Sequence, residues 1–332
     1  MHTTAARRRP HLADRAAAPG ERLKVAVLMG GVGHERDVSM VSGREVAKAL
    51  LAEGHLVVAY ELETDDERAL DPLRVGFDVV FLALHGEYGE DGTIQAALAR
   101  RGIAYTGSGP EASARAFDKA VAKRLLRRAG VPLAEHHLVS PPVGERELRH
   151  ALRCCGEGRW VVKPTRMGSS VGVALCQGAA ELRRALEEGA RFRQPLLVEE
   201  FVPGRELTCG VLGEEALPVV EIASKRGFYD YRAKYDAGSG TEYLVEPEAV
   251  PLRVRDEVRR LALRCHKVLG CRDVSRVDFR YDPNAGRLAV LEVNTLPGMT
   301  PTSLFPKAAA AAGIPFGALL TRLCRMAVGV SA

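Results

Sequence analysis

The chain has 332 residues, of which 46% are hydrophobic, 27% charged and 5% aromatic. No apolar run approaches the roughly 18 residues that a membrane-spanning helix needs, and the composition excludes the disordered, collagen-like and disulfide-scaffold classes. The formal net charge is +5, and residues 1–22 contribute +3 of it. We therefore expect a soluble protein of two or three domains with a disordered basic tail at 1–22, no membrane segment and no nucleic-acid partner.

The seven cysteines are an odd number and include no C-x-x-C pair and no histidine at zinc-ligand spacing. This pattern is typical of reduced thiols in a reducing compartment. We therefore expect a cytoplasmic protein whose cysteines are mostly small core residues.

The N-terminal elements predict an α/β unit, because continuous apolar runs are typical of strands in a parallel sheet. A glycine turn follows the first strand, and a glycine-rich acidic turn follows the third. In chain order we expect a strand at 25–29, a turn at 30–33, a helix at 42–51, strands at 56–60 and 77–84, a turn at 85–92 and a helix at 93–101.

The following part of the chain predicts an antiparallel hairpin with a glycine loop at its tip and, further on, a polar segment at 225–245 that is too long for a simple turn. A functional lid is the favoured interpretation of that segment. The remaining expected elements are helices at 113–129, 254–269 and 316–328, strands at 160–163, 173–175, 196–199, 206–212, 217–222, 276–281 and 288–293, and a turn at 282–286.

The loop at 164–172 predicts a phosphate site. Its small residues let backbone N–H groups approach an anion, and Lys163 at the strand end can place its ammonium on the same anion. The loop lacks Walker A spacing, and an ordinary hairpin turn is the alternative. Lys119 follows Asp118 at a helical position, where a solvated surface charge is the alternative.

Three oxygen-bearing side chains near the C-terminus predict a metal site. Asp278 lies on one expected strand, and Glu292 and Asn294 alternate on the next, so that strand periodicity turns all three to one face. Oxygen ligands facing a phosphate site suit Mg²⁺. Solvent-facing polar positions are the alternative.

Arg276 lies two residues before Asp278, on the same strand face. A fixed guanidinium together with a glycine N–H from the segment 294–300 can stabilise an oxyanion in acyl transfer. A structural arginine that pairs with a carboxylate is the alternative.

Five ordered segments, spread over residues 24–325, together resemble the D-alanine–D-alanine ligase family of ATP-grasp enzymes. They are Gly30-Gly31-x-x-x-Glu35-Arg36-x-Val38-Ser39, His85-Gly86-x-x-Gly89-Glu90-Asp91-Gly92-x-Ile94-Gln95, Lys163-Pro164-x-x-x-Gly168-Ser169-Ser170-Val171-Gly172, Phe228-Tyr229-Asp230-Tyr231-x-Ala233-Lys234-Tyr235, and Arg276-Val277-Asp278 with Glu292-Val293-Asn294-Thr295-x-Pro297-Gly298-Met299-Thr300-x-x-Ser303-Leu304.

The resemblance implies an α/β protein with the ATP-grasp fold, in which an N-terminal parallel-sheet domain precedes two domains that enclose ATP. The expected boundaries are 23–112 for the N-terminal domain, 113–200 for the central subdomain and 201–332 for the C-terminal subdomain. The resemblance also suggests a homodimer.

The resemblance assigns residues to ATP and to two Mg²⁺ ions, for which Mn²⁺ is a substitute. Ser169 and Lys234 are two of the residues that the resemblance implies for binding ATP. The remaining expected ligands are Lys119 and Lys163 for the phosphates, Glu199, Glu200 and Val202 for the adenine side, Glu206 for the ribose, and Asp278, Glu292 and Asn294 for the metals.

A second set of residues is implied for the two D-alanines and the reaction between them. Glu35 would bind the first ammonium and connect through Ser169 and Tyr235 across the lid, with His85 near the carboxylate. The other implied residues are Arg276 and Gly298 for the oxyanion, and Lys234, Ser303 and Leu304 for the second D-alanine.

The implied reaction joins two D-alanines through an acyl phosphate, at the expense of ATP, for peptidoglycan precursor synthesis. A closing lid would protect the acyl phosphate from water. Two alternatives stay open. One is a ligase that uses D-lactate or D-serine as the second substrate, although Lys234 and Tyr235 favour an amine nucleophile. The other is a nucleotide-binding protein without catalysis.

Overall fold

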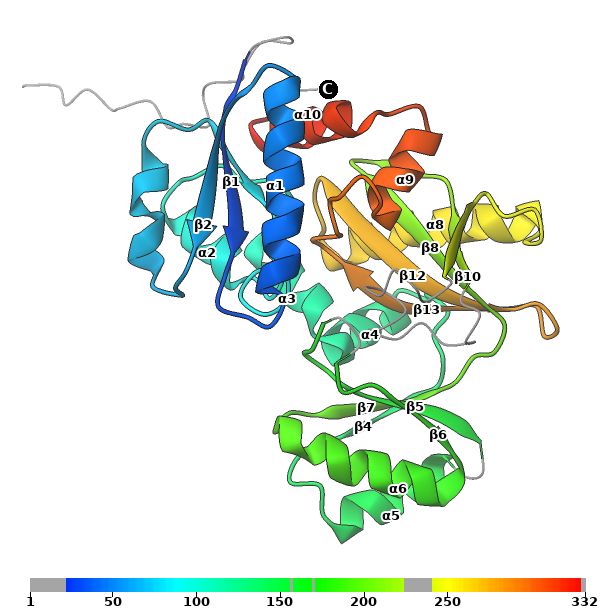
Figure 1. Cartoon of the computed structure of the whole chain (residues 1–332). Helices are drawn as coiled ribbons and strands as arrows, with labels where there is room; N and C mark the ends of the chain where they lie inside the picture. Colours follow the sequence, from blue (N-terminus) through cyan, green and yellow to red (C-terminus); the bar gives the residue numbers. More distant parts are fainter. Residues whose placement is uncertain (1–21, 156–157, 169–170, 224–240, 330–332) are drawn as a thin grey trace, which may run out of the picture.

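Three sheets, with helices packed around them, make up the structure (Figure 1). This mixture of a parallel sheet and antiparallel sheets confirms the predicted α/β class with α+β elements. The structure is a computed structural model, and it describes residues 22–155, 158–168, 171–223 and 241–329. The predicted tail at 1–22 lies outside the described residues except for Arg22.

The first sheet is parallel, with the order β2-β1-β3. Six of the seven residues of the central strand β1 are buried, as its continuous apolar run predicts. Helix α1 begins six residues earlier than the expected 42–51. The elements of this part are β1 (Lys24–Gly30), α1 (Arg36–Ala52), β2 (Leu56–Leu62), η2 (Glu67–Arg74), β3 (Val79–Leu82) and α2 (Thr93–Arg100).

The second sheet is antiparallel, with the order β4-β7-β5-β6, and α5 and α6 pack against it (Figure 1). The predicted hairpin around the glycine loop is confirmed, because β5 pairs with β6 antiparallel. The sequence interpretation missed β4, α5 and α6. The elements are β4 (His136–Val139), α5 (Glu145–Cys155), β5 (Arg159–Pro164), β6 (Ala174–Gln177), α6 (Gly178–Gly189), η3 (Ala190–Phe192) and β7 (Leu196–Glu200).

The third sheet has six strands, with β12 between β8 and β13. Helix α8 (Leu252–Leu269) packs against it through a shared hydrophobic core. Residues 225–240 of the expected lid lie outside the described residues, and the end of the lid forms β11. The strands are β8 (Arg205–Leu212), β9 (Glu215–Ala216), β10 (Val220–Ala223), β11 (Glu242–Val245), β12 (Val274–Asp282) and β13 (Arg287–Asn294).

The single helix expected at 113–129 is two helices, α3 (Pro110–Phe117) and α4 (Lys119–Arg128). Asp118 has an extended backbone between them, and its carboxylate accepts hydrogen bonds from the backbone N–H groups of Ala120 and Val121. An aspartate that caps a helix in this way competes with a continuous helix. The break makes Lys119 the first residue of α4.

The C-terminal helices α9 (Leu304–Ala311) and α10 (Phe316–Ala327) return to the first sheet, where α10 lies beside α1 (Figure 1). Leu319 and Leu323 share a hydrophobic core with Val46 and Leu50. No single helix of the described chain is long and apolar enough to cross a membrane; α9 and α10 pass that test only as a pair bent by 102°.

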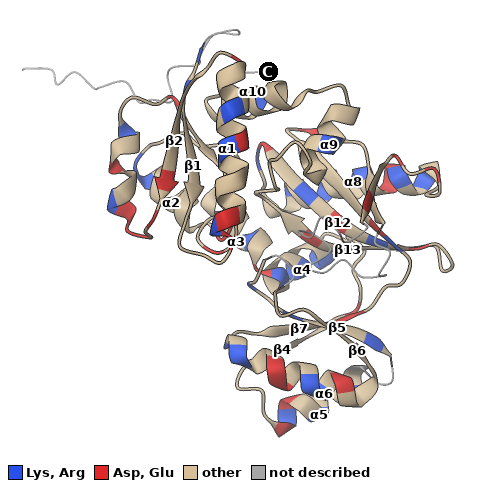
Figure 2. Cartoon of the chain, in the orientation of Figure 1, with Lys and Arg blue, Asp and Glu red and all other residues tan. Residues whose placement is uncertain are grey.

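Helices α1, α5 and α6 each contain both basic and acidic residues (Figure 2). The cysteines with described side chains are free thiols. Burial raises the pKa of Cys176 and of Cys271 to about 11, so that these thiols stay protonated at neutral pH.

His266 on α8 predicts a loss of stability in acid. Its ring lies 2.7 Å from the Ser275 hydroxyl of β12, and burial lowers its pKa from 6.5 to about 4. The unfolded chain therefore binds more protons below pH 6.5, and the stabilisation is lost as the pH falls toward 4. We expect urea titrations to show about 2 kcal/mol less stability from this group at pH 5 than at pH 7.5.

The matched variant is His266→Gln, which cannot take up the proton. Its stability should vary less between the two pH values than that of the unchanged chain. An equal pH dependence in both proteins would contradict the assignment to His266.

Candidate active site

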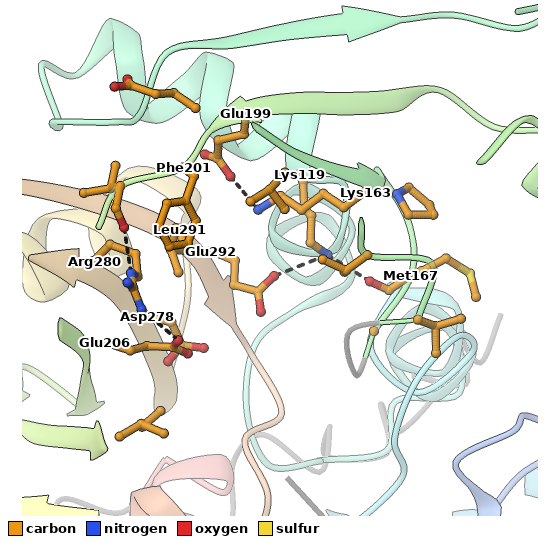
Figure 3. A pocket seen from close by; sticks show the side chains of 18 of the residues that line it. Lys119, Lys163, Met167, Glu199, Phe201, Glu206, Asp278, Arg280, Leu291 and Glu292 are labelled. Atoms are coloured by element: carbon orange, nitrogen blue, oxygen red, sulfur yellow. Dashed lines mark hydrogen bonds and ion pairs between the residues drawn. The ribbon is translucent and has the colours of Figure 1, made fainter. Parts of the chain in front are cut away.

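A cavity lies between the second and third sheets (Figure 3). Strands β5 and β7 supply one wall, β12 and β13 the opposite wall, and α4 contributes its first residue. Nine of the predicted site residues line it: Lys119, Lys163, Glu199, Glu200, Val202, Glu206, Arg276, Asp278 and Glu292.

Lys119 connects the start of α4 with both the glycine loop and the third sheet. Its ammonium donates to the Met167 carbonyl at 2.9 Å and lies 3.3 Å from Glu292 Oε2 (Figure 3). Its backbone N–H donates to the Thr165 carbonyl. The cap at Asp118 fixes where α4 begins, and thereby directs this lysine into the cavity.

Glu199 on β7 is 2% exposed and holds a lysine at each carboxylate oxygen. Lys163 Nζ lies 2.6 Å from Oε2, and Lys123 Nζ contacts Oε1. Burial acts to raise the pKa of Glu199, but the two ammonium groups outweigh it and lower the pKa. The carboxylate is therefore ionised between the two lysines.

The sequence interpretation missed Lys123, which lies four residues after Lys119 on α4. Residues four apart lie on one face of a helix, so that spacing was the available signal. Lys123 is 1% exposed, and burial lowers its pKa. From the sequence alone, a lysine in a basic helix such as α4 is expected at the surface, because its buried partner Glu199 is distant in the chain.

The two carboxylates expected to bind metal face each other. Asp278 on β12 and Glu292 on β13 are direct partners in the antiparallel register, as Arg276 and Asn294 are. Arg276 donates to both oxygens of Asp278, at 2.9 and 2.8 Å, and the Thr208 hydroxyl donates to Oδ1 at 2.6 Å.

The described residues contain no group of three His, Cys, Asp or Glu side chains placed to hold a metal ion. Asn294 is not among the residues that line the cavity.

A β-bulge brings Leu291 to the cavity, although strand periodicity alone would place it on the opposite face of the sheet from Glu292. Phe279 pairs with Val290 while Asp278 pairs with Glu292, so that Leu291 has no partner in the register. Both Leu291 and Glu292 consequently line the cavity (Figure 3). The bulge gives the cavity an apolar surface beside a carboxylate.

Arg280, which the sequence interpretation also missed, holds the segment after β7 in place. It donates to the carbonyls of Val202 and Gly204, each at 3.0 Å, and lies 3.6 Å from Glu206 Oε2. Glu200 makes a bidentate pair with Arg287 of β13, at 2.7 and 2.6 Å. Its carboxylate is thus already engaged by the third sheet.

Glu35 lies outside the cavity lining but next to two glycine loops. A Cβ added to Gly86 would meet its Oε2 at 2.6 Å, and one added to Gly168 would meet it at 3.1 Å. His85 lies 3.3 Å from the Ser42 hydroxyl and 3.7 Å from Glu90 Oε1. The described structure therefore brings Glu35 to the loop that contains Ser169, which itself lies outside the described residues, as do Lys234 and Tyr235.

Ser303 closes the turn that begins at Thr300 and lies beside Gly298. Its hydroxyl accepts from the Thr300 N–H at 3.1 Å and lies 2.7 Å from the Thr300 hydroxyl. A Cβ added to Gly298 would lie 3.1 Å from the Ser303 hydroxyl. Ser303 directly precedes Leu304, the first residue of α9.

Comparison with known proteins identifies two family models in this chain. The model described as D-ala D-ala ligase C-terminus matches residues 125–325, and the model described as D-ala D-ala ligase N-terminus matches residues 61–108.

Curated relatives match nearly the whole chain. The D-alanine–D-alanine ligase of Acidiphilium cryptum is 46% identical over 296 residues, which are 89% of this chain and 95% of the relative. The enzyme of Gluconobacter oxydans is 44% identical over 309 residues, 92% of this chain and 99% of the relative.

Solved structures agree with the sequence relatives. The D-alanine–D-alanine ligase of Bacillus anthracis complexed with ATP has a TM-score of 0.79 at 31% identity and covers 92% of this chain and 98% of its own. The D-alanyl-alanine synthetase A of Vibrio cholerae has a TM-score of 0.82 at 28% identity, with coverage of 93% and 99%. The chain therefore belongs to the D-alanine–D-alanine ligase family, as its motifs predict.

Proposed function

We propose that this protein is an ATP-dependent ligase that joins two D-alanines into D-alanyl-D-alanine for peptidoglycan precursor synthesis. The observation that carries the proposal is that one cavity collects eight of the predicted nucleotide and metal residues, together with Arg276. A relative with the same fold was solved as a complex with ATP.

In this proposal the nucleotide occupies the cavity between the second and third sheets. The base lies beside Glu199 and Val202, the ribose lies beside Glu206, and the phosphates lie between Lys119 and Lys163. The phosphate assignment follows the charge of the site, because the ammonium groups of Lys119 and Lys163 suit an anion. The base and ribose assignments follow the family resemblance.

Magnesium suits the carboxylates at the opposite wall. Asp278 and Glu292 are direct cross-strand partners and present hard oxygen ligands toward the cavity. Arg276 and Lys119 partner these carboxylates, so the cation would join an existing charge network. We propose Asp278, Glu292 and Asn294 as the ligands of two Mg²⁺, or of Mn²⁺ in its place, which would neutralise phosphate charge.

The remaining predicted residues are proposed to bind the amino acids. Glu35 would hold the first ammonium with His85 near the carboxylate, in agreement with its position between Gly86 and Gly168. Arg276 and the Gly298 N–H would stabilise the oxyanion. The residues proposed beyond these are Ser169 and Tyr235 for the connection to the lid, and Lys234, Ser303 and Leu304 for the second D-alanine.

The reaction has two steps. The carboxylate of the first D-alanine attacks the γ-phosphorus of ATP, which forms an acyl phosphate and releases ADP. The deprotonated amine of the second D-alanine then attacks the acyl carbonyl, and the C–O bond to phosphate breaks. Lysine and arginine charges at the cavity stabilise the oxygens on which negative charge gathers in both steps.

The pure protein, incubated with ATP, Mg²⁺ and D-alanine, should release phosphate and dipeptide in equal amounts. Coupled phosphate detection and chromatography of the dipeptide measure the two products. Binding of ATP with no dipeptide at neutral or alkaline pH would instead support the nucleotide-binding protein without catalysis.

The second substrate is tested by competition. An amine must lose its proton before it attacks, whereas the hydroxyl of D-lactate need not. If D-alanine is the acceptor, its share of the product against D-lactate should rise from neutral to alkaline pH. D-Serine is an amine too, so it is distinguished by its own competition against D-alanine.

The domain boundaries, the location and the assembly belong to the same proposal. We propose domains at 23–112, 113–200 and 201–332, a cytoplasmic location and a homodimer. Light scattering of the purified protein should give twice the chain mass of 35.9 kDa. A monomeric mass would contradict the dimer alone and leave the ligase reaction standing.

A further inference from the structure

Lys123 is the member of the buried cluster with Glu199 and Lys163 that does not line the cavity. Its ammonium contacts Glu199 Oε1 and lies 3.4 Å from the Val290 carbonyl oxygen. Lys163 lines the cavity and lies 2.6 Å from the other oxygen, Oε2. One lysine therefore holds the carboxylate from within the protein, and the other holds it at the cavity wall.

We propose that Lys123 is a positioning residue that makes the site select purines with an amino group at position 6, because it fixes the orientation of the Glu199 carboxylate. The inference rests on the proposed function in one respect: it takes the nucleotide base to lie beside Glu199.

The Glu199 carboxylate can rotate unless both of its oxygens are held. The last torsion of a glutamate is broad and roughly two-fold, so a single partner leaves the group free to turn. With Lys163 alone, both oxygens would compete for one ammonium. With Lys123 at Oε1 as well, each oxygen has its own cation, and the plane of the carboxylate is fixed.

The Glu199 carboxylate keeps hydrogen-bonding capacity when both lysines are bound to it. Each carboxylate oxygen has two lone-pair sites, so lone pairs remain on Glu199 for a further donor after both lysines are in place. An amino group at position 6 supplies that donor. A keto oxygen there would bring two acceptors together in a buried site, which is unfavourable. Discrimination therefore depends on an ionised and correctly turned carboxylate.

Lys123 lies on the same helix as Lys119. Helix α4 carries Lys119 toward Glu292 and, one turn later, Lys123 toward Glu199. The Val290 carbonyl that Lys123 approaches lies next to the bulge that exposes Leu291 to the cavity. The same helix thus serves the phosphate end with Lys119 and the base end with Lys123.

The test compares the binding of ADP with that of inosine diphosphate, which carries oxygen at position 6, to the full chain by calorimetry. Lys123→Met should weaken ADP binding about 10- to 100-fold, the loss of a charge-assisted hydrogen bond, and change inosine diphosphate binding less than about threefold. Lys119→Met, the matched control on the same helix, should weaken both nucleotides by similar factors.

Lys123→Met should fold, because it leaves one lysine and one glutamate in the cluster and methionine is a similarly unbranched side chain. Lys123→Gln, which keeps a donor without the charge, is the second variant and should give an intermediate ADP preference. An unchanged preference in Lys123→Met, or no preference in the unaltered protein, would overturn the inference. Neither measurement needs turnover, so absence of dipeptide would contradict the proposed reaction only.

Discussion

Asp278→Asn is expected to lower kcat by at least about 10³-fold, or roughly 4 kcal/mol of barrier, while the chain still folds. Asparagine keeps the shape of the side chain and one oxygen acceptor. It removes the charge that faces Glu292 across the strand pair and that holds both arms of Arg276. The variant therefore disturbs the proposed cation ligands and the oxyanion group together.

The assay is dipeptide synthesis at saturating ATP and D-alanine, with thermal unfolding measured on the same samples. Binding of Mn²⁺ to the ADP complex, followed by electron paramagnetic resonance, reports on the cation without turnover and should weaken in the variant. Asp282→Asn is the matched control, because Asp282 lies on the same strand but caps the turn at Asn284. Full activity of Asp278→Asn would refute the metal assignment.

The sequence predicted the parts of this site that follow from a regular period. Because side chains alternate along a strand, Asp278 and Glu292 could be placed on one face, and the register confirms that they are partners. The bulge at Leu291 could not be predicted, because it depends on how the partner strand pairs. The sequence therefore predicted that the two carboxylates lie on one face of the third sheet, but it did not predict that Leu291 lies beside them.

Elements were missed where local signals conflicted with tertiary packing. The sequence interpretation did not include α9, which contains Pro306 in its first turn, where a missing N–H removes no helical hydrogen bond. Lys123 reads as a surface charge, and only the pairing of β7 with β5 brings Glu199 and Lys163 to it. Contacts between distant segments decide such positions.

Glu199→Gln is expected to lower the free energy of unfolding by about 3–5 kcal/mol, because it leaves buried charges without a counter-ion. Lys123 and Lys163 would then face each other around a neutral amide, and Lys123 is 1% exposed. Urea unfolding followed by fluorescence measures the loss. Glu200→Gln is the matched control at the neighbouring position, where a partly exposed pair with Arg287 should contribute only about 1 kcal/mol.

Adding Lys123→Met to Glu199→Gln should recover part of that loss, because it removes one of the two unpaired ammonium groups. The double variant would then be more stable than Glu199→Gln alone, a coupling of roughly 1–3 kcal/mol between residues 76 positions apart in the sequence. Losses that simply add would mean that Lys123 and Glu199 act independently. The sign of this coupling therefore separates a buried ion cluster from two unrelated packing contacts.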